Sequence, residues 1–183
     1  MTLAPPGGFV FPEHVPTALT YAEAARLNSE ARGKVVLEMG AQFGCSTICL
    51  AQSARHVVSV DWHRGDPQAG MHDTLTTYWR NLKEHGIDHK VTVLVDRFDR
   101  ALGLLRPGMF DLAFIDGCHD EEAVQSDIEL ALPLLRRPGT ILFHDYGRAQ
   151  FPGVKRQVDR LADRNLSLVN GTDTLAGVTI TRA

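Results

Sequence analysis

Carboxylates and imidazoles follow two of the apolar runs in this sequence. The run "DLAFI" is followed by Asp116 and, three residues later, by His119, whereas the run "GTILF" is followed by His144 and Asp145. Aspartate oxygens can hold a divalent cation, and imidazole titrates near neutral pH and can act as a general base. If the two runs form neighbouring strands about 4.8 Å apart, Asp116 and Asp145 can share one cation. Side chains alternate along a strand, so only one of His144 and Asp145 must face the cleft unless a loop begins there.

A glycine turn follows the apolar run "VVLEM". Gly40 and Gly44 lead directly into a predicted helix, whose N-terminus can cradle a carboxylate or a phosphate. The spacing departs from G-x-G-x-x-G because Gln42 occupies the middle position, so a ligand loop and a tight turn both remain open. Glu38 lies inside the apolar run, where an unpaired carboxylate is costly. It therefore either accepts hydrogen bonds from a ligand or pairs with a neighbouring group.

Acids also follow the second and third apolar runs. Asp61 follows "HVVSV", at a position where parallel α/β folds commonly bind ribose hydroxyls, and Trp62 can stack on a flat ring. The alternative is a solvated acid with the Trp packed under its loop. Asp96, Arg97 and Phe98 follow "KVTVLV", where they can line an adenine pocket, because an aspartate accepts from an exocyclic amine and a phenyl ring offers an apolar face. The alternative is helix capping, which is common for an acid at a strand end and is open to Asp99 here.

These residues depend on strands that alternate with helices along the chain. The apolar runs predict buried strands at residues 34–39, 56–60, 90–96, 111–116, 139–145, 166–170 and 176–182. Amphipathic periodicity predicts helices at residues 18–31, 45–54, 74–86, 120–135 and 152–165, with a short helix ending at Leu105. This alternation is typical of a mostly parallel sheet with helices on both faces. Ligands bind such sheets outside the carboxyl ends of the strands, where the residues above are expected to lie.

Composition limits the class of protein. The chain has 183 residues, 44% of them hydrophobic and 22% charged, which fits one globular domain with a full core. A net charge of -3 gives no indication of a nucleic-acid partner, and the absence of a long apolar run predicts no membrane partner. Three cysteines argue against a disulfide scaffold and favour the reducing cytoplasm. Cys45 and Cys49 are expected to be small buried residues on one helix face, because no second pair completes a metal site.

The chain resembles class I S-adenosylmethionine-dependent methyltransferases, and within them the small-molecule O-methyltransferases that include macrolide-sugar (macrocin-type) enzymes. The segments that carry the resemblance are "VVLEMGAQFGCST", "VVSVDW" and "DLAFIDGCHDEEAVQSDIELALPLLRRPGTILFHDYG". The resemblance implies a Rossmann-like, doubly wound, mostly parallel seven-stranded sheet with helices on both faces and a C-terminal antiparallel strand. It further implies one methyltransferase domain, residues 1–183. The N-terminal arm and helix would span residues 1–33, the cofactor-binding and catalytic core 34–147, and the C-terminal helix and strand pair 148–183.

The resemblance also implies roles for individual positions. The positions expected to bind S-adenosylmethionine are Glu38, Gly40, Gly44, Ser46, Asp61, Trp62, Asp96, Arg97 and Asp116. His119 corresponds to a proposed general base, with Asp116 beside it. In metal-dependent relatives an acid matching Asp116 and an acidic pair after the next strand bind magnesium. Here that pair is His144 and Asp145, so magnesium or manganese is an open choice, since manganese accepts imidazole more readily.

The expected reaction is therefore methyl transfer to the hydroxyl group of a small molecule, such as a sugar, a phenol or another natural product. Two other classes of protein remain open, namely a cofactor-binding module or subunit without catalysis and an NAD-dependent oxidoreductase. The departure from G-x-G-x-x-G counts against the oxidoreductase. The sequence leaves open the identity of the acceptor, and it leaves open whether the chain forms a homo-oligomer.

Overall fold

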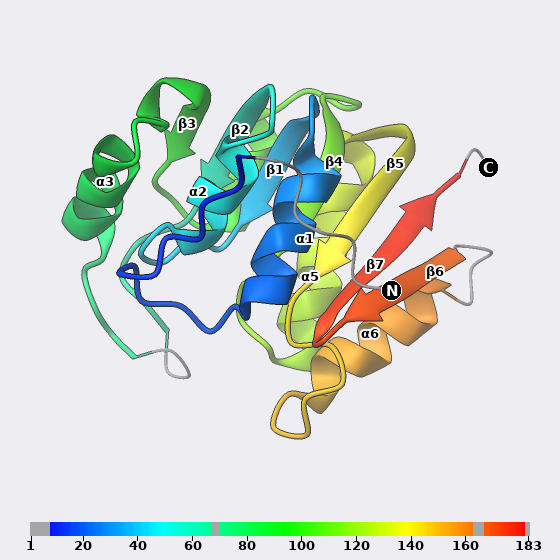
Figure 1. The fold of residues 1–183 in the computed structure, drawn as a ribbon. Coiled ribbons are helices and arrows are strands. Elements are labelled where there is room, and N and C mark those ends of the chain that lie inside the picture. The colour runs from blue at the N-terminus through cyan, green and yellow to red at the C-terminus, as the bar shows by residue number, and fades with distance from the viewer. Residues whose placement is uncertain (1–7, 67–69, 163–166, 182–183) are drawn as a thin grey trace.

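The computed structural model describes residues 8–66, 70–162 and 167–181 of the chain and contains a seven-stranded sheet (Figure 1). The strands are β1 (Val35–Met39), β2 (His56–Val60), β3 (Val91–Leu94), β4 (Phe110–Ile115), β5 (Leu135–Phe143), β6 (Ser167–Thr172) and β7 (Leu175–Ile180). The α-helices are α1 (Tyr21–Ala31), α2 (Cys45–Ala51), α3 (Leu75–Glu84), α4 (Phe98–Ala101), α5 (Glu121–Ala131) and α6 (Pro152–Ala162). Short 3-10 helices are η1 (Asp88–Lys90), η2 (Leu102–Leu104) and η3 (Leu132–Leu134).

The sheet has the strand order β3-β2-β1-β4-β5-β7-β6. Strands β1 to β5 pair in parallel, whereas β7 pairs antiparallel with both β5 and β6. The strand order reverses between β1 and β4, which is where ligands bind open α/β sheets. The predicted fold class is confirmed, including the closing hairpin of β6 and β7.

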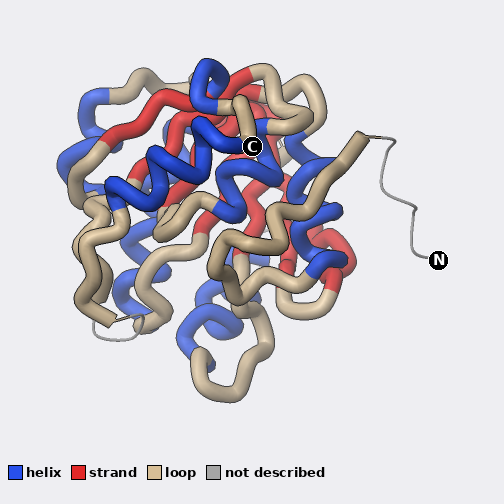
Figure 2. Tube along the Cα trace, turned by 60° about the vertical axis from the view of Figure 1, so that its left-hand side comes forward, coloured by secondary structure: helices blue, strands red, loops and turns tan. Residues whose placement is uncertain are grey.

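Helices cover both faces of the sheet (Figure 1 and Figure 2). On one face, α1, α2 and α3 pack on side chains such as Val36, Val57 and Leu112. On the other face, α4, α5 and α6 pack on the alternating set that includes Leu37 and Ala113. Because successive strand residues face opposite sides, a strand that is apolar throughout is buried between two such layers. In the described parts of the chain, no helix combines the length and apolarity required to cross a bilayer.

Strand β5 departs from its predicted start. The sequence predicted a strand that starts at residue 139, but β5 begins at Leu135 and continues through Pro138. Leu135 pairs with Phe110, and regular pairing resumes where Thr140 lies opposite Leu112. The extra residues on β5 form an irregularity in the ladder, and such irregularities accommodate a proline that cannot donate a ladder hydrogen bond. The carboxyl end of β5 remains aligned with that of β4.

Glu38 links three elements beneath the carboxyl edge of the sheet. Its carboxylate has no exposed surface and accepts hydrogen bonds of 2.6 Å from the hydroxyls of Ser46, Thr47 and Ser59, which lie on α2 and β2. Burial raises the pKa of Glu38 to about 7, although the three hydroxyl donors lower it in part. The acid therefore pairs with neighbouring groups of the protein, one of the two alternatives that the sequence left open.

We expect Glu38 to make the stability of the protein dependent on pH. A carboxyl group with a raised pKa adds stability that is fully present below its unfolded value of 4.5 and is lost as the pH rises through about 7. Between pH ~4 and pH ~8 the wild type should therefore lose about 3 kcal/mol of unfolding free energy relative to Glu38→Gln, which has no carboxyl group to ionise at this position. Urea unfolding at several pH values measures it. Glu122→Gln, which removes an exposed carboxylate, is the control, and parallel pH profiles for Glu38→Gln and the wild type would contradict the expectation.

Candidate active site

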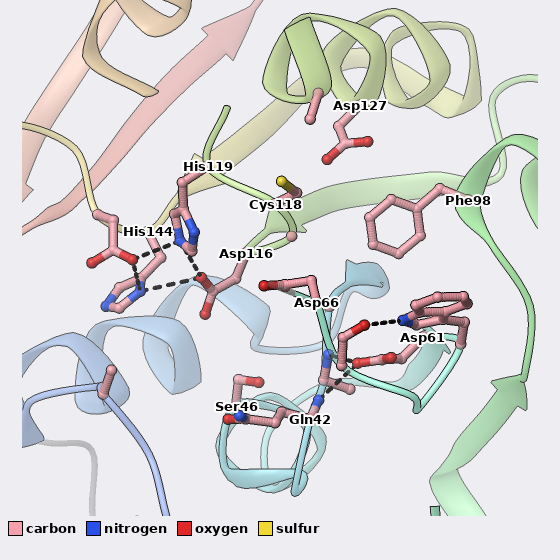
Figure 3. Close-up of a pocket in the computed structure, with 18 of the residues that line it drawn as sticks. Gln42, Ser46, Asp61, Asp66, Phe98, Asp116, Cys118, His119, Asp127 and His144 are labelled. Carbon is pink, nitrogen blue, oxygen red and sulfur yellow. Dashed lines mark hydrogen bonds and ion pairs between the residues drawn. The ribbon is translucent and has the colours of Figure 1, made fainter. Parts of the chain in front are cut away.

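A cavity of about 690 Å³ opens at the carboxyl ends of the parallel strands. Most of the residues predicted to form a site line it (Figure 3), and these are Gly40, Ser46, Asp61, Trp62, Asp96, Arg97, Asp116, His119, His144 and Asp145. Glu38 and Gly44 are not among the lining residues, and their predicted contact with a ligand stays a prediction. Glu38 instead holds the hydroxyl of Ser46, which does reach the cavity.

Two histidines and two aspartates meet at one end of this cavity. His119 Nε2 lies 2.8 Å from Asp145 Oδ2 and 3.7 Å from Asp116 Oδ1. His144 Nδ1 lies 3.3 Å from Asp116 Oδ1 and 3.4 Å from Asp145 Oδ2. Figure 3 shows the imidazoles converging on the same carboxylate oxygens from β4 and β5. The sequence left open whether both His144 and Asp145 face this end of the cavity, and the structure brings both together with Asp116 and His119.

The end of β5 explains how His144 and Asp145 both face this cluster. The strand ends at Phe143, so the two residues lie beyond the alternating part of the backbone. Asp145 has φ 61°, in the left-handed region, where aspartate is among the more tolerant residues. This turn directs Asp145 to the same side as His144, and the His144 imidazole contacts both Asp145 and Asp116.

The carboxylates hold both imidazoles in the protonated state. Burial lowers the pKa of His119, but contacts with Asp116 and Asp145 outweigh that effect and raise the pKa to about 9. Burial likewise opposes protonation of His144, yet Asp116, Asp145 and Glu23 together raise its pKa to about 12. The same contacts outweigh the burial of Asp116 and Asp145 and lower the pKa of both carboxyl groups.

Glu23 is a member of this cluster that the sequence did not reveal. It lies in the first turn of α1, and its Oε2 is 3.5 Å from His144 Nε2, with both side chains nearly inaccessible to solvent. Glu23 also accepts hydrogen bonds from Thr20 and from the backbone and hydroxyl of Thr174. Although burial raises its pKa, these hydrogen bonds and His144 lower it to about 2. In the sequence, Thr20 and Glu23 form only a capping box, which indicates a helix start and nothing more.

Loop residues after β5 complete this end of the cavity. Arg148 Nε lies 2.8 Å from Asp145 Oδ1, so a fixed positive charge faces the carboxylate that also holds His119. The ring of Phe151 stacks on His119, with centroids 4.1 Å apart and planes 18° apart. The stacked ring and the carboxylate together fix the orientation of the imidazole.

The glycine turn after β1 is required by close packing of the backbone. Gly40 has φ 95°, and a Cβ atom there would lie 2.1 Å from the carbonyl oxygen of Asp116. Only glycine therefore lets the end of β1 approach the end of β4 so closely. Gly44 has φ 93°, and a Cβ atom there would lie 3.0 Å from the ring of Tyr78, so its requirement comes from packing outside the cavity.

Asp61 stabilises the same turn by accepting hydrogen bonds from backbone amides. Its Oδ2 accepts hydrogen bonds of 2.8 Å from the amides of Ala41 and Gln42, and its Oδ1 accepts one of 2.7 Å from the amide of His63. A carboxylate offers about four acceptor positions, so limited capacity remains for a ligand. Trp62 beside it is 37% exposed, and its indole nitrogen donates to the carbonyl of Gly65. The indole face therefore remains accessible at the cavity wall.

The residues after β3 lie at another part of the cavity wall. Asp96 accepts a hydrogen bond from the amide of Arg97, whose exposed side chain pairs with Asp99. Phe98 also lines the cavity, and across from it lies Asp127 of α5 (Figure 3). Asp127 was not singled out in the sequence, although an acid beside apolar residues of an amphipathic helix is a detectable signal.

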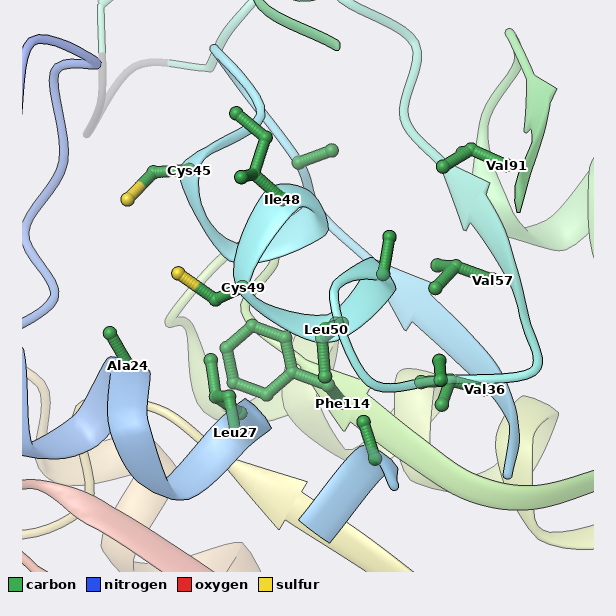
Figure 4. Packing of buried hydrophobic residues seen from close by; sticks show 14 of the residues in the cluster. Ala24, Leu27, Val36, Cys45, Ile48, Cys49, Leu50, Val57, Val91 and Phe114 are labelled. Carbon is green, nitrogen blue, oxygen red and sulfur yellow. The ribbon is translucent and has the colours of Figure 1, made fainter. Parts of the chain in front are cut away.

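Cys45 and Cys49 lie on one face of α2, as predicted. Both are buried, and Figure 4 shows their sulfur atoms on the same side of α2. Among the described residues, the group with the spacing of metal ligands is instead Asp116, His144 and Asp145, whose donor atoms all lie within 4.8 Å of one another.

Comparison with known proteins places this site in a family. Residues 37–146 match the family described as a methyltransferase domain. The cofactor-bound protein Rv0187 from MTB is 23% identical, with a TM-score of 0.74 over 93% of this chain and 85% of that one. TomG from Streptomyces achromogenes, an O-methyltransferase of tomaymycin synthesis in complex with SAM, is 23% identical, with a TM-score of 0.68 over 90% and 82%.

A third solved structure has the same fold. The O-methyltransferase from Bacillus cereus in complex with SAH is 18% identical, with a TM-score of 0.67 over 92% of this chain and 86% of that one. At such identities the structural matches establish the fold, whereas the matched segment spans more than half of the chain and establishes the family. The chain therefore belongs to the methyltransferase domain family, and its predicted resemblance to class I S-adenosylmethionine-dependent methyltransferases is confirmed.

Proposed function

We propose that this protein transfers a methyl group from S-adenosylmethionine to a hydroxyl group of a small molecule. The observation that carries the proposal is the contact of His119 with Asp116 and Asp145 at one end of a cavity of suitable size. TomG and the Bacillus cereus protein, which share the fold, are O-methyltransferases in complex with SAM and SAH, and they support this choice. Sugars, phenols and related natural products are the acceptors we propose to test.

The proposed cofactor position follows the strand ends. The turn at Gly40 and the hydroxyl of Ser46 would receive the methionine end, with Glu38 acting indirectly by orienting Ser46. The remaining acceptor capacity of Asp61 and the indole of Trp62 would contact the ribose. S-adenosylmethionine supplies an already activated methyl group, so the main task of the protein is to align the acceptor with it.

We propose that His119 accepts the proton of the acceptor hydroxyl. A hydroxyl that keeps its proton is a poor nucleophile, and imidazole is a suitable base when it is neutral. The contact of His119 with Asp145 orients the ring and stabilises the imidazolium that forms after proton transfer, while Phe151 excludes water from one face of the ring. Asp116 lies between the two histidines and stabilises both positive charges.

His119→Asn should lower turnover by about 10²- to 10⁴-fold and leave the affinity for S-adenosylhomocysteine within about twofold, since only proton transfer is removed. In the wild type, turnover should rise with pH as His119 loses its proton, because only the neutral imidazole can act as a base. Steady-state kinetics across pH, with calorimetry for binding, measure both effects. His89→Asn, a site in η1, is the control, and equal losses of turnover and affinity in His119→Asn would argue against the role.

The proposal includes a divalent cation at Asp116, His144 and Asp145. Three donor atoms within 4.8 Å can ligate one ion, and the imidazole favours manganese over magnesium. A bound cation would supply Lewis-acid stabilisation of the deprotonated acceptor. His144 must lose its proton to coordinate, and the pKa of about 12 shows how strongly Glu23 and the two aspartates oppose that loss. Cation and proton therefore compete for the same imidazole nitrogen.

This competition gives the metal proposal a specific signature. Because one proton leaves His144 for each cation bound, the affinity for Mn²⁺ should rise about tenfold per pH unit below the pKa of His144. Calorimetric titration between pH ~6 and pH ~9 measures this slope, and Asp145→Asn should lose the binding. Prolonged chelation should abolish turnover, with Mn²⁺ restoring it. Full turnover after chelation would show that the imidazolium of His144 balances the carboxylates without a metal.

Cofactor choice separates the proposed function from its alternatives. Calorimetric titration of the wild type should detect binding of S-adenosylhomocysteine and none of NAD, because the glycine turn lacks the dinucleotide spacing. Binding of NAD alone would identify an oxidoreductase. Binding of S-adenosylhomocysteine without turnover on sugar, phenolic and other hydroxylated acceptors would favour the non-catalytic binding module.

A further inference from the structure

Asp127 is a buried carboxylate that the proposed reaction does not use. It lies on α5 and is 6% exposed, and its side chain points into the cavity, where Figure 3 shows it near Phe98 and Cys118. In the described part of the chain it has neither a hydrogen bond nor an ion pair. Burial alone raises the pKa of Asp127 to about 7. A buried acid without a donor is costly, so a ligand that brings a donor would stabilise it.

The surroundings of Asp127 form a narrow slot. A Cβ atom at Gly117 would lie 2.8 Å from the ring of Phe98 and 3.0 Å from Asp127 Oδ2, so the ring and the carboxylate both border the space beside the bare backbone of Gly117. Ala123 and Leu130 of α5 also line this part of the cavity. The slot thus offers apolar walls and one acceptor-only carboxylate, which matches a planar heterocycle that carries a hydrogen-bond donor on its edge.

We propose that Asp127 recognises the exocyclic amino group of the adenine ring of the cofactor. This assignment rests on the proposed use of S-adenosylmethionine. It adds the residue that recognises the adenine ring of that cofactor. Adenine has one strong donor on its exposed edge, the amino group, whereas its ring nitrogens are acceptors that a carboxylate repels. The slot places adenine between Phe98 and α5, whereas the sequence predicted contacts with Asp96 and Arg97.

The other cationic or donor groups of the cofactor fit this slot less well. The ammonium of the methionine end belongs near Gly40 and Ser46, and Figure 3 shows Ser46 well apart from Asp127. The ribose hydroxyls belong near Asp61, whose remaining acceptor capacity lies beside the glycine turn. The apolar walls at Phe98 and Leu130 suit a flat ring and not a charged or sugar group.

The test uses two ligands that differ only at the edge of the base. S-inosyl-L-homocysteine carries an oxygen where S-adenosyl-L-homocysteine carries the amino group, and a hydrogen on the neighbouring ring nitrogen, so at the amino position itself it presents an acceptor to the carboxylate. By calorimetry at pH ~8.5, the wild type should bind the adenosyl ligand at least tenfold more tightly. Asp127→Asn can donate from its amide to that oxygen, so it should weaken adenosyl binding, strengthen inosyl binding and reduce the preference by at least tenfold. Glu129→Gln, on the exposed face of α5, should leave the preference unchanged.

Each other outcome overturns the assignment. Equal affinities of the wild type for the two ligands, or an unchanged preference in Asp127→Asn, would show that Asp127 does not recognise the amino group of adenine. The melting temperature provides a second readout, because removing an unpaired buried charge should leave Asp127→Asn at least as stable as the wild type at pH ~8.5. A destabilised or unfolded variant would indicate a structural role. Failure of the wild type to bind S-adenosylhomocysteine at all would instead overturn the proposed cofactor, and with it this assignment.

Discussion

The contacts of His144 with three carboxylates are the interaction on which the rest of the site depends. His144 is almost fully buried and lies between Glu23, Asp116 and Asp145, so it joins α1 to the ends of β4 and β5. Breaking such a cluster by removing one partner leaves a buried charge without compensation, which makes its members mutually dependent. The position of His119 follows from it, because the two aspartates that hold His144 also hold His119.

Much of the fold and of this end of the cavity could be predicted from the sequence because both depend on local patterns. Continuous apolar runs identify buried parallel strands, and strand ends in such a sheet meet at one edge, which brought Asp116 and Asp145 together. Glu23 could not be predicted in the same way, since its partner His144 lies in the other half of the chain and only the tertiary fold joins them. The early start of β5 depends likewise on pairing with β4, which local sequence does not encode.

The partners of Glu38, Gly44 and Asp61 within the protein show a second limit of sequence reasoning. A glycine near a strand end indicates a close approach or an unusual conformation of the backbone, and an acid there indicates a carboxylate that needs hydrogen-bond donors. Neither residue type identifies the group that it contacts. In the structure, hydroxyls satisfy Glu38, the ring of Tyr78 accounts for Gly44, and three amides occupy most of Asp61. These partners come from other elements, and residue spacing alone does not identify them.

Glu38 and Asp127 together show how a folded chain separates structural from functional carboxylates. Burial raises the pKa of each carboxyl group to about 7. Glu38 accepts hydrogen bonds from three hydroxyls, whereas Asp127 accepts no hydrogen bond from the described residues. The cost of burying Glu38 is offset within the fold and ties β1 to α2 and β2. The cost of burying Asp127 is offset by nothing in the described part of the protein, and Asp127 faces the cavity. A buried acid without a hydrogen-bond donor is stabilised when a bound ligand supplies that donor. The site therefore binds a ligand with a donor at this position more tightly than a ligand without one.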